Sequence, residues 1–304
     1  MSTNPTSTDP AANLSSLIEL IRNNSPALVL TGAGISTDSG IPAYRDQHGN
    51  WTQPQPVQAQ DFRRNPQVRQ RYWLRSMLGW PRFHRALTNP SHDALFKLEQ
   101  AGIVSCVITQ NVDGLHRKAG SKNVVELHGS LAQVICLSCG ELTPRLDLQQ
   151  RLEQSNSRFL EMKFNPAADG DATPVASGQT PDPQEFNVVS CRQCQGVLKP
   201  DVVFYGENVP SARVSYCMDQ LDTAGLLLCI GTSLSVMSGY RFCRAAEKQS
   251  KPIAIVNQGV TRADDLTDLK VALPCASALQ ALCESLLQDH SIYPGSQHGS
   301  VNSP

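Results

Sequence analysis

The chain has 304 residues, and its 26 Lys and Arg residues nearly balance its 27 Asp and Glu residues, which gives a net charge of −1. This balance provides no electrostatic basis for general binding to nucleic acid or to an anionic membrane. The longest apolar stretch, residues 226–230, has the length of a strand and is too short to cross a bilayer.

The two ends of the chain predict no globular element. Residues 1–12 are rich in Ser, Thr, Pro and Asn and contain no Lys or Arg, so they lack the features of a secretory signal or a mitochondrial transit peptide. We therefore expect a disordered N-terminus on a cytoplasmic protein. Residues 290–304 are expected to form a second disordered tail, which leaves residues 13–289 for the folded part.

The first folded residues predict a helix, a buried strand and a glycine-rich turn. Leu and Ile recur at helical spacing over residues 13–23, and an apolar strand over residues 27–30 leads into the turn T-G-A-G-I-S-T-D-S-G. A strand that runs into such a turn can hold a phosphate on free backbone N–H groups. The dinucleotide fingerprint is only partly matched, because Thr37 stands where the third glycine belongs. A tight strand-to-helix turn without a ligand is the alternative interpretation.

The loop that follows the turn carries an aromatic and a basic side chain. Pro42 ends any helix that begins at Ser36, so Tyr44 and Arg45 are expected on a loop over the glycine turn. Arg45 could face a pyrophosphate or a substrate there. Alternatively, it is a surface arginine paired with Asp46.

Residues 63–85 contain seven arginines and no acidic residue, with aromatic residues among them. Basic residues interleaved with aromatics can bind nucleic acid or an acidic ligand. The favoured interpretation is one or two helices with aromatics facing the core and solvated arginines, because the net charge does not support nucleic-acid binding. A further helix is predicted from Pro90 to Gly102.

The chain next places polar residues directly after two short apolar runs. The strand predicted over residues 104–109 is followed by Gln110, Asn111 and Asp113, and the run 124–127 is followed by His128. Open α/β sheets bind ligands at the carboxyl ends of their strands, so these side chains should meet at a site. The alternative is that Asn111 and Asp113 cap a helix and that His128 is an ordinary loop histidine.

Four of the ten cysteines form two C-x-x-C pairs, which are Cys136 with Cys139 and Cys191 with Cys194. Two such pairs supply four thiolates for one tetrahedral Zn²⁺, and a site closed by four cysteines is structural rather than catalytic. A thioredoxin-like redox pair is disfavoured, since neither pair opens a helix after a strand. Between the pairs, a helix is expected over residues 146–160 and a flexible insert over about 163–187.

Strands are also predicted over residues 226–230, 253–256 and 270–273, followed by a helix through Leu287. Strands that alternate with helices and end in Gly, Ser, Thr or Asn indicate an α/β fold with a parallel, doubly wound, Rossmann-like sheet.

Taken in order, six motifs resemble the sirtuin family over about residues 14–287. They are G-A-G-I-S with S-G-I-P and Arg45, then T-Q-N-V-D, His128-Gly129, the two C-x-x-C pairs, Gly231-Thr232-Ser233, and Asn257. Tyr44, the run S-G-Y-R and the run T-R-A-D are similar to the class II branch and its bacterial relatives. The resemblance implies a Rossmann-like large domain and a smaller domain built from about residues 41–90 and a zinc ribbon of about 131–200.

The resemblance also implies an NAD-dependent protein-lysine deacylase, with NAD and one structural zinc as its cofactors. Catalysis would involve His128 as general base, with Asn111 and Asp113. The cofactor would contact Gly32, Ala33, Gly34, Ser36, Thr37, Pro42, Tyr44, Arg45, Gln110, Asn111, Asp113, His128, Gly231, Thr232, Ser233, Asn257, Gln258, Gly259 and Cys275. The substrate lysine and peptide would contact Val202, Val203, Phe204, Gly206 and Glu207.

The products implied are nicotinamide, free lysine and O-acyl-ADP-ribose. Desuccinylase-type sirtuins carry a Tyr and an Arg three residues apart just after the glycine-loop arginine, and residues 46–52 contain no such pair. Tyr72 and Arg75 have the spacing but lie elsewhere in the chain, so acetyl or longer neutral acyl groups are expected.

Two other functions remain open at this stage. One is a protein ADP-ribosyltransferase that uses the same NAD site, and the other is a non-catalytic NAD sensor or interaction module in which His128 is dispensable. For partners, we expect acylated lysines of proteins, no nucleic acid, no membrane and a monomeric chain.

Overall fold

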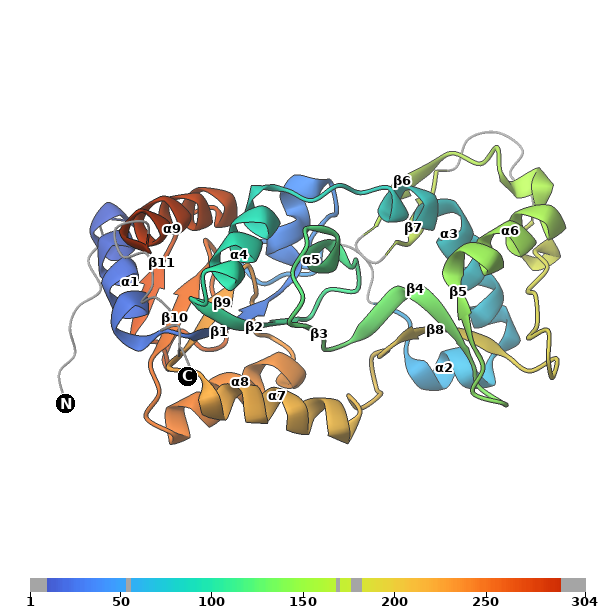
Figure 1. Ribbon diagram of the computed structural model, residues 1–304. Helices are drawn as coiled ribbons and strands as arrows, with labels where there is room; N and C mark the ends of the chain where they lie inside the picture. The colour runs from blue at the N-terminus through green and yellow to red at the C-terminus, as the bar shows by residue number, and fades with distance from the viewer. Residues whose placement is uncertain (1–9, 53–55, 168–169, 176–181, 291–304) are drawn as a thin grey trace, which may run out of the picture.

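The computed structural model describes residues 10–52, 56–167, 170–175 and 182–290, which form two lobes (Figure 1). Both ends of the described chain lie in the larger lobe, on the left of the view. The predicted disordered ends, residues 1–9 and 291–304, lie outside the described residues. Residues 10–12, also expected to be disordered, instead begin the first helix.

The larger lobe is built on a six-stranded sheet with the order β11-β10-β9-β1-β2-β3. All neighbouring strands in it are parallel. This confirms the predicted α/β class. The strands are β1 (Ala27–Thr31), β2 (Val104–Thr109), β3 (Val124–Glu126), β9 (Leu226–Ile230), β10 (Ile253–Val256) and β11 (Leu269–Val271).

Helices cover both faces of this sheet, as expected because its central strands β1, β9 and β10 are buried along their whole length. Helices α1 (Pro10–Asn24), α4 (Pro90–Gln100) and α9 (Cys275–His290) pack on one face, and α7 (Ser211–Thr223) and α8 (Met237–Lys248) on the other (Figure 1). Alternate residues of β1 therefore enter different cores: Val29 packs with α4 and α9, whereas Leu28 and Leu30 pack with α7 and α8.

The strand order locates a topological switch point. From β1 the chain proceeds outward through β2 and β3, and it later returns to the other side of β1 to add β9, β10 and β11. The connections of the two halves thus diverge beyond the carboxyl ends of β1 and β9, and this is where open α/β sheets form a ligand crevice.

The smaller lobe combines helices with a three-stranded antiparallel sheet of order β5-β4-β8. Its core is a separate apolar cluster around Phe62, Trp73, Leu152 and Phe159. The elements are α2 (Ala59–Arg64), α3 (Pro66–His84), β4 (Gly129–Cys136), β5 (Leu142–Pro144), α6 (Arg145–Ser155) and β8 (Leu198–Val202).

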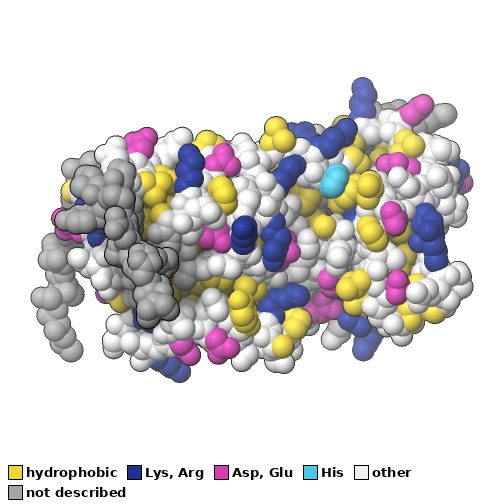
Figure 2. All heavy atoms as spheres, in the orientation of Figure 1, with side chains coloured by type: hydrophobic (Ala, Val, Ile, Leu, Met, Phe, Trp, Pro, Cys, Tyr) yellow, Lys and Arg dark blue, Asp and Glu magenta, His cyan; other side chains and the backbone are white. Residues whose placement is uncertain are grey.

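The arginine-rich segment has the predicted arrangement of aromatic side chains. It forms α2 and α3, and its aromatic residues are buried, namely Phe62, Tyr72, Trp73, Trp80 and Phe83. On the face drawn in Figure 2, basic and acidic side chains are interspersed. No helix within the described ranges is long and apolar enough to span a membrane.

The described part of the insert between the cysteine pairs contains more regular structure than predicted, and residues 168–169 and 176–181 of the predicted flexible segment lie outside the described residues. The helix expected to reach residue 160 ends at Ser155, because the Asn156 side chain bonds back to the Leu152 carbonyl and accepts a bond from the Asn187 N–H. A single turn, Ser157–Phe159, follows. Strands β6 (Phe164–Pro166) and β7 (Ala172–Pro174) then pair as a hairpin, and the turn Pro183–Glu185 comes after it.

Two further boundaries differ from the sequence predictions. The helical segment after the first glycine turn begins at Ala33 rather than at Ser36, and it is a 3₁₀ helix, η1 (Ala33–Ser39). The last strand lies at Leu269–Val271 instead of residues 270–273. A short helix, α5 (Leu115–Lys118), follows the polar run after β2.

Candidate active site

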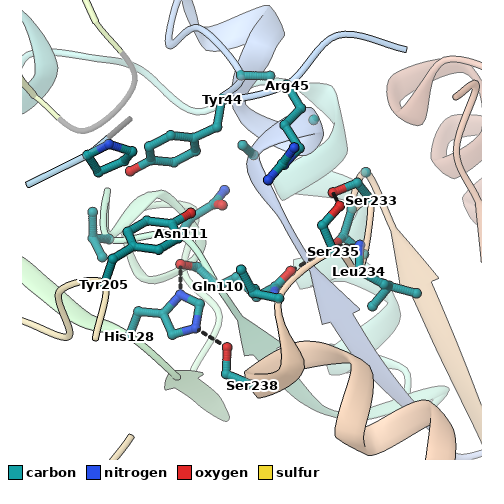
Figure 3. A pocket seen from close by; sticks show the side chains of 18 of the residues that line it. Tyr44, Arg45, Gln110, Asn111, His128, Tyr205, Ser233, Leu234, Ser235 and Ser238 are labelled. Carbon is teal, nitrogen blue, oxygen red and sulfur yellow. Dashed lines mark hydrogen bonds between the residues drawn. The ribbon is translucent and has the colours of Figure 1, made fainter. Parts of the chain in front are cut away.

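A cavity of about 650 Å³ lies between the two lobes, at the switch point of the large sheet. Its walls come from the turns after β1 and β9, the polar residues after β2, the loop over the glycine turn, and the segment after β8. Figure 3 shows Tyr44 and Tyr205 at one end of this pocket and Ser233, Leu234 and Ser235 at the other. The volume is in the range of ordinary ligand sites.

The glycine turn after β1 is locked against the turn after β9. The Gly34 N–H donates to the Gly231 carbonyl oxygen at 2.8 Å. A Cβ on Gly34 would lie 2.8 Å from that same oxygen, and Gly231 has a φ of +60°. Side chains at these two positions would push the turns apart, so glycine is required here for close backbone approach.

Asn111 and Asp113 hold the glycine turn from behind. The Asn111 Nδ2 donates to the Gly32 carbonyl at 3.1 Å and to Ser36 Oγ at 3.0 Å. Ser36 Oγ in turn donates to Asp113 Oδ2 at 2.7 Å, while Asp113 Oδ1 accepts from the Leu115 N–H that begins α5. The N-cap residue of this helix is Gly114, so Asn111 and Asp113 are not its cap residues; Asp113 accepts from its first N–H and also fixes Ser36 under the turn.

His128 faces the cavity with both ring nitrogens engaged (Figure 3). Its Nδ1 lies 2.9 Å from the Gln110 carbonyl oxygen, which can only accept, so Nδ1 carries the proton. Its Nε2 lies 2.8 Å from Ser238 Oγ and is therefore the acceptor. Burial lowers the pKa of His128 below its usual value, which outweighs the opposing effect of the Gln110 hydrogen bond. The neutral imidazole can accept a proton at Nε2.

Ser238 reaches His128 because the start of α8 packs tightly against the residue after β2. A Cβ on Gly239 would lie 2.3 Å from Gln110 Nε2, so glycine lets the helix approach this side chain without displacing it. The Gln110 side chain is held in turn by Thr232, whose Oγ1 donates to Gln110 Oε1 at 2.6 Å.

The loop over the glycine turn, residues 43–52, contacts segments on both sides of the cleft. The Arg45 guanidinium lies 4.0 Å above the Trp51 ring and donates to the Gly49 carbonyl, so Arg45 is not the partner of Asp46. Trp51 also packs edge-on against Tyr205. At the other end, the Val260 N–H donates to the Gln47 carbonyl at 3.2 Å, which ties this loop to the segment after β10.

The segment after β8 runs along the cavity beside His128. The Val203 N–H donates to the His128 carbonyl at 2.7 Å. Glu207 stabilises the turn that follows: its carboxylate pairs with Lys199 and with Arg63, each at 2.9 Å, and accepts from the Phe204 N–H. The predicted substrate residue Glu207 thus lines the cavity with its charge already compensated.

The four predicted zinc ligands lie together at the far end of the small lobe's sheet. Their sulfur atoms are all within 4.8 Å of one another, with Cys136 Sγ 3.5 Å from Cys194 Sγ and Cys139 Sγ 3.8 Å from Cys191 Sγ. Four soft sulfur donors at this spacing suit one structural Zn²⁺.

The structure brings most of the predicted site residues to the same cavity. Only Gly32, Ser36, Pro42 and Asp113 of the predicted NAD and substrate residues do not line it, and three of these lie in the network behind the glycine turn. Residues that the sequence did not assign to the site also line it, among them Asp38, Val112, Asp171, Tyr205 and Ser238.

Tyr72 and Arg75 belong to the site, contrary to the expectation from the sequence. They lie far along the chain from the glycine-loop arginine, yet both line the same cavity as His128. Helix α3 carries them to the cleft, which linear spacing does not reveal.

The chain is similar to known proteins over most of its length. The model of the Sir2 family matches residues 32–238. NAD-dependent protein deacetylase 1 of Streptomyces coelicolor is 50% identical over 261 residues, covering 85% of each chain, and NAD-dependent protein deacetylase 2 of Bradyrhizobium diazoefficiens is 47% identical over 273 residues, covering 90% of this chain and 98% of its own. A solved complex of Sir2 with a p53 peptide and NAD⁺ has a TM-score of 0.70 and 27% identity, covering 92% of this chain and 99% of the other. The chain belongs to the Sir2, or sirtuin, family.

Proposed function

We propose that this protein is an NAD-dependent protein-lysine deacylase whose products are nicotinamide, free lysine and O-acyl-ADP-ribose. The observation that carries the proposal is His128: a neutral imidazole with an accepting Nε2 faces a cavity formed by the glycine turn on one side and the segment after β8 on the other. The relatives named above are deacetylases, and the neighbouring structures include Sir2 with a deacetylated peptide and 3′-O-acetyl ADP-ribose.

The cavity has the features that NAD requires. It lies at the switch point, and Ala33 and Gly34 of the glycine turn line it, so a pyrophosphate can approach a stretch of backbone with little side-chain bulk. We assign the adenosine end to Ser233, Asn257 and Cys275, and the nicotinamide ribose to Gln110 and Asn111. When bound, NAD⁺ supplies the ribose that accepts the acyl group as its bond to nicotinamide breaks.

In this assignment the protein's side chains bind and orient the cofactor, and one of them deprotonates a ribose hydroxyl. His128 Nε2 takes a proton from a ribose hydroxyl, which its lowered pKa permits near neutral pH. The loop that carries Tyr44 and Arg45 lines the cleft, where it would help to shield the bound cofactor from water. Asp113 acts on the cofactor through the glycine turn, which Asn111 also helps to hold in place.

The substrate would enter along β8. This strand is at the edge of its three-stranded sheet, and residues 202–206 continue from it along the cavity. An extended peptide can pair with such an edge, while its acylated lysine passes between Val203 and Phe204 toward His128.

Three finer assignments belong to the same proposal. The runs S-G-Y-R and T-R-A-D support a class II-like bacterial sirtuin. Two C-x-x-C pairs that meet as a zinc site support a reducing compartment, and hence the cytoplasm. A monomer is expected, and size-exclusion chromatography with light scattering would check it.

NAD⁺ labelled in its adenylate moiety tests the reaction. With an acetyl-lysine peptide, the deacylase predicts label in free O-acetyl-ADP-ribose, in equal amount to the nicotinamide released. Label that remains covalently attached to protein would instead support an ADP-ribosyltransferase at the same site.

A further inference from the structure

Tyr72 and Arg75 lie one helical turn apart on α3 and both line the active-site cavity. The Tyr72 ring packs edge-on against Phe204, with ring centroids 5.4 Å apart, and Phe204 belongs to the proposed substrate segment. The basic side chain of Arg75 therefore lies in the wall of the small lobe that an acyl chain would approach.

Arg75 already forms an ion pair with a carboxylate of the same protein. Its Nη2 lies 2.6 Å from Asp171 Oδ2, and its Nε donates to the Ala172 carbonyl at 2.9 Å. Asp171 is almost buried and also lines the cavity, and its Oδ1 accepts from the Ala172 N–H at 2.7 Å. The guanidinium and the carboxylate thus form a pair with no net charge in the cavity wall.

The position of Asp171 is set by tight packing of the β6–β7 hairpin against α3. A Cβ on Gly79 would lie 2.3 Å from the Asp171 carbonyl oxygen, so glycine lets the backbone of the hairpin touch the helix. Gly170, with a φ of +66°, packs between Phe83 and Leu131. These contacts hold the Asp171 carboxylate against Arg75. The insert between the cysteine pairs therefore contributes a residue to the active-site cavity.

We propose that Asp171 makes this cavity selective for acyl groups with an uncharged distal end. A carboxylate-tipped acyl chain would have to share Arg75 with Asp171, and two like charges in a half-buried site repel each other. An acyl chain that ends in a methyl or an amide group meets no such repulsion. This inference rests on the proposed deacylase function. It attributes the acyl-group specificity of the enzyme to the insert between the cysteine pairs.

Two peptides that differ only in charge test it. One carries glutaryl-lysine and the other carries the glutaryl group as its terminal carboxamide, with succinyl and its carboxamide as a shorter pair. Calorimetric Kd values without NAD⁺ and kcat/KM values with NAD⁺ are measured for each. For the wild type, the carboxamide should be preferred by about tenfold or more.

The variant Asp171→Asn should abolish or reverse that preference, because Arg75 then faces the acyl carboxylate alone. Asparagine keeps the Oδ1 acceptor for the Ala172 N–H, so the hairpin should stay folded, which a melting curve verifies. Asp171→Asn should therefore bind and deacylate the anionic peptides better than the wild type does. The double variant Arg75→Gln/Asp171→Asn should lose this improvement. The control is Glu185→Gln, which removes the carboxylate of an exposed pair with Arg158 in the same insert. This variant should prefer the carboxamide peptides over the carboxylate peptides to the same degree as the wild type.

A wild type that binds the anionic peptides as well as their carboxamides, or an Asp171→Asn variant with the wild-type ratio, would overturn the inference. The failure of the proposed function looks different. In that case no peptide would be deacylated by any variant, while the binding ratio would still report on Asp171.

Discussion

Ser238 Oγ lies 2.8 Å from Nε2 of His128, the nitrogen that must accept a proton if His128 is the base. The opposite nitrogen is committed to the Gln110 carbonyl, so Ser238 is the donor to Nε2. A donor to the neutral ring stabilises the neutral form and holds the pKa down, in the same direction as burial. Ser238 thus positions the proposed base and keeps it ready to accept.

The first prediction concerns the pH profile of Ser238→Ala. Loss of the donor should raise the pKa of His128 and move the acid limb of kcat/KM to higher pH by up to about one unit, since a neutral hydrogen bond contributes about 0.5–1.5 kcal/mol. Ser238→Thr retains the hydroxyl and should restore the wild-type profile. An alanine variant with an unshifted acid limb would exclude this role.

The second prediction concerns Asp113, which contacts Ser36 and the start of α5 rather than the cavity. Asp113→Ala should lower the free energy of unfolding by about 1–3 kcal/mol, because two buried donors lose their acceptor. It should also raise the KM for NAD⁺, since the glycine turn loses its support. Urea unfolding and initial rates measure both, with Asp93→Ala, an exposed acid of α4, as the control. Unchanged stability together with unchanged KM would contradict the network described above.

The third prediction concerns the four cysteines. The purified protein should contain one zinc per chain, and Cys191→Ala should lose it, whereas Cys283→Ala, in α9, should retain it. Chelation should lower the melting temperature by about 10 °C or more, because a structural zinc contributes several kcal/mol to folding. A metal-free protein that melts at the same temperature would show that the site is not structural.

The fourth prediction follows from His116, which is fully buried against Thr31 Oγ1. Burial, with a smaller contribution from His92, lowers its pKa from 6.5 to about 3. Between these values the unfolded chain binds a proton that the folded protein does not, so stability falls as the pH drops below 6.5. For this group the loss is about 1.4 kcal/mol per pH unit.

His116→Gln removes this titration and should flatten the pH dependence. Between pH 7 and pH 5 the wild type should lose about 2 kcal/mol more of its free energy of unfolding than the variant. Urea unfolding at the two pH values gives the difference directly. Both proteins keep the zinc site and the other histidines, so parallel losses in the two would mean that His116 is not the group responsible.

The sequence predicts those parts of this fold that are encoded locally. The central strands of the large sheet, β1, β9 and β10, are largely apolar runs, and the polar residues that follow β1, β2 and β9 are adjacent to them in the chain. The cysteine pairs are recognisable from spacing alone. In all these cases, a short stretch of sequence contains the whole pattern.

The rest of the site depends on contacts between distant segments. Arg75 pairs with Asp171, which lies nearly a hundred residues further along the chain. Asp171 belongs to a hairpin that can pack against α3 only because residue 79 is glycine. Ser238 belongs to the run S-G-Y-R, which indicated a branch of the family but did not reveal a bond to His128. Hydrophobic periodicity gives the type of each element but not which side chains of two elements face each other.

The central claim is that His128 is the base of a deacylation that consumes NAD⁺. The most direct test is nicotinamide release from NAD⁺ with an acetyl-lysine peptide, for the wild type, His128→Ala and His84→Ala, an exposed histidine stacked on Trp80. We predict release that requires the acylated peptide, falls by a factor of about 10² or more in His128→Ala, and is retained in His84→Ala. Equal release by the wild type and His128→Ala, or no release although NAD⁺ binds, would contradict this account.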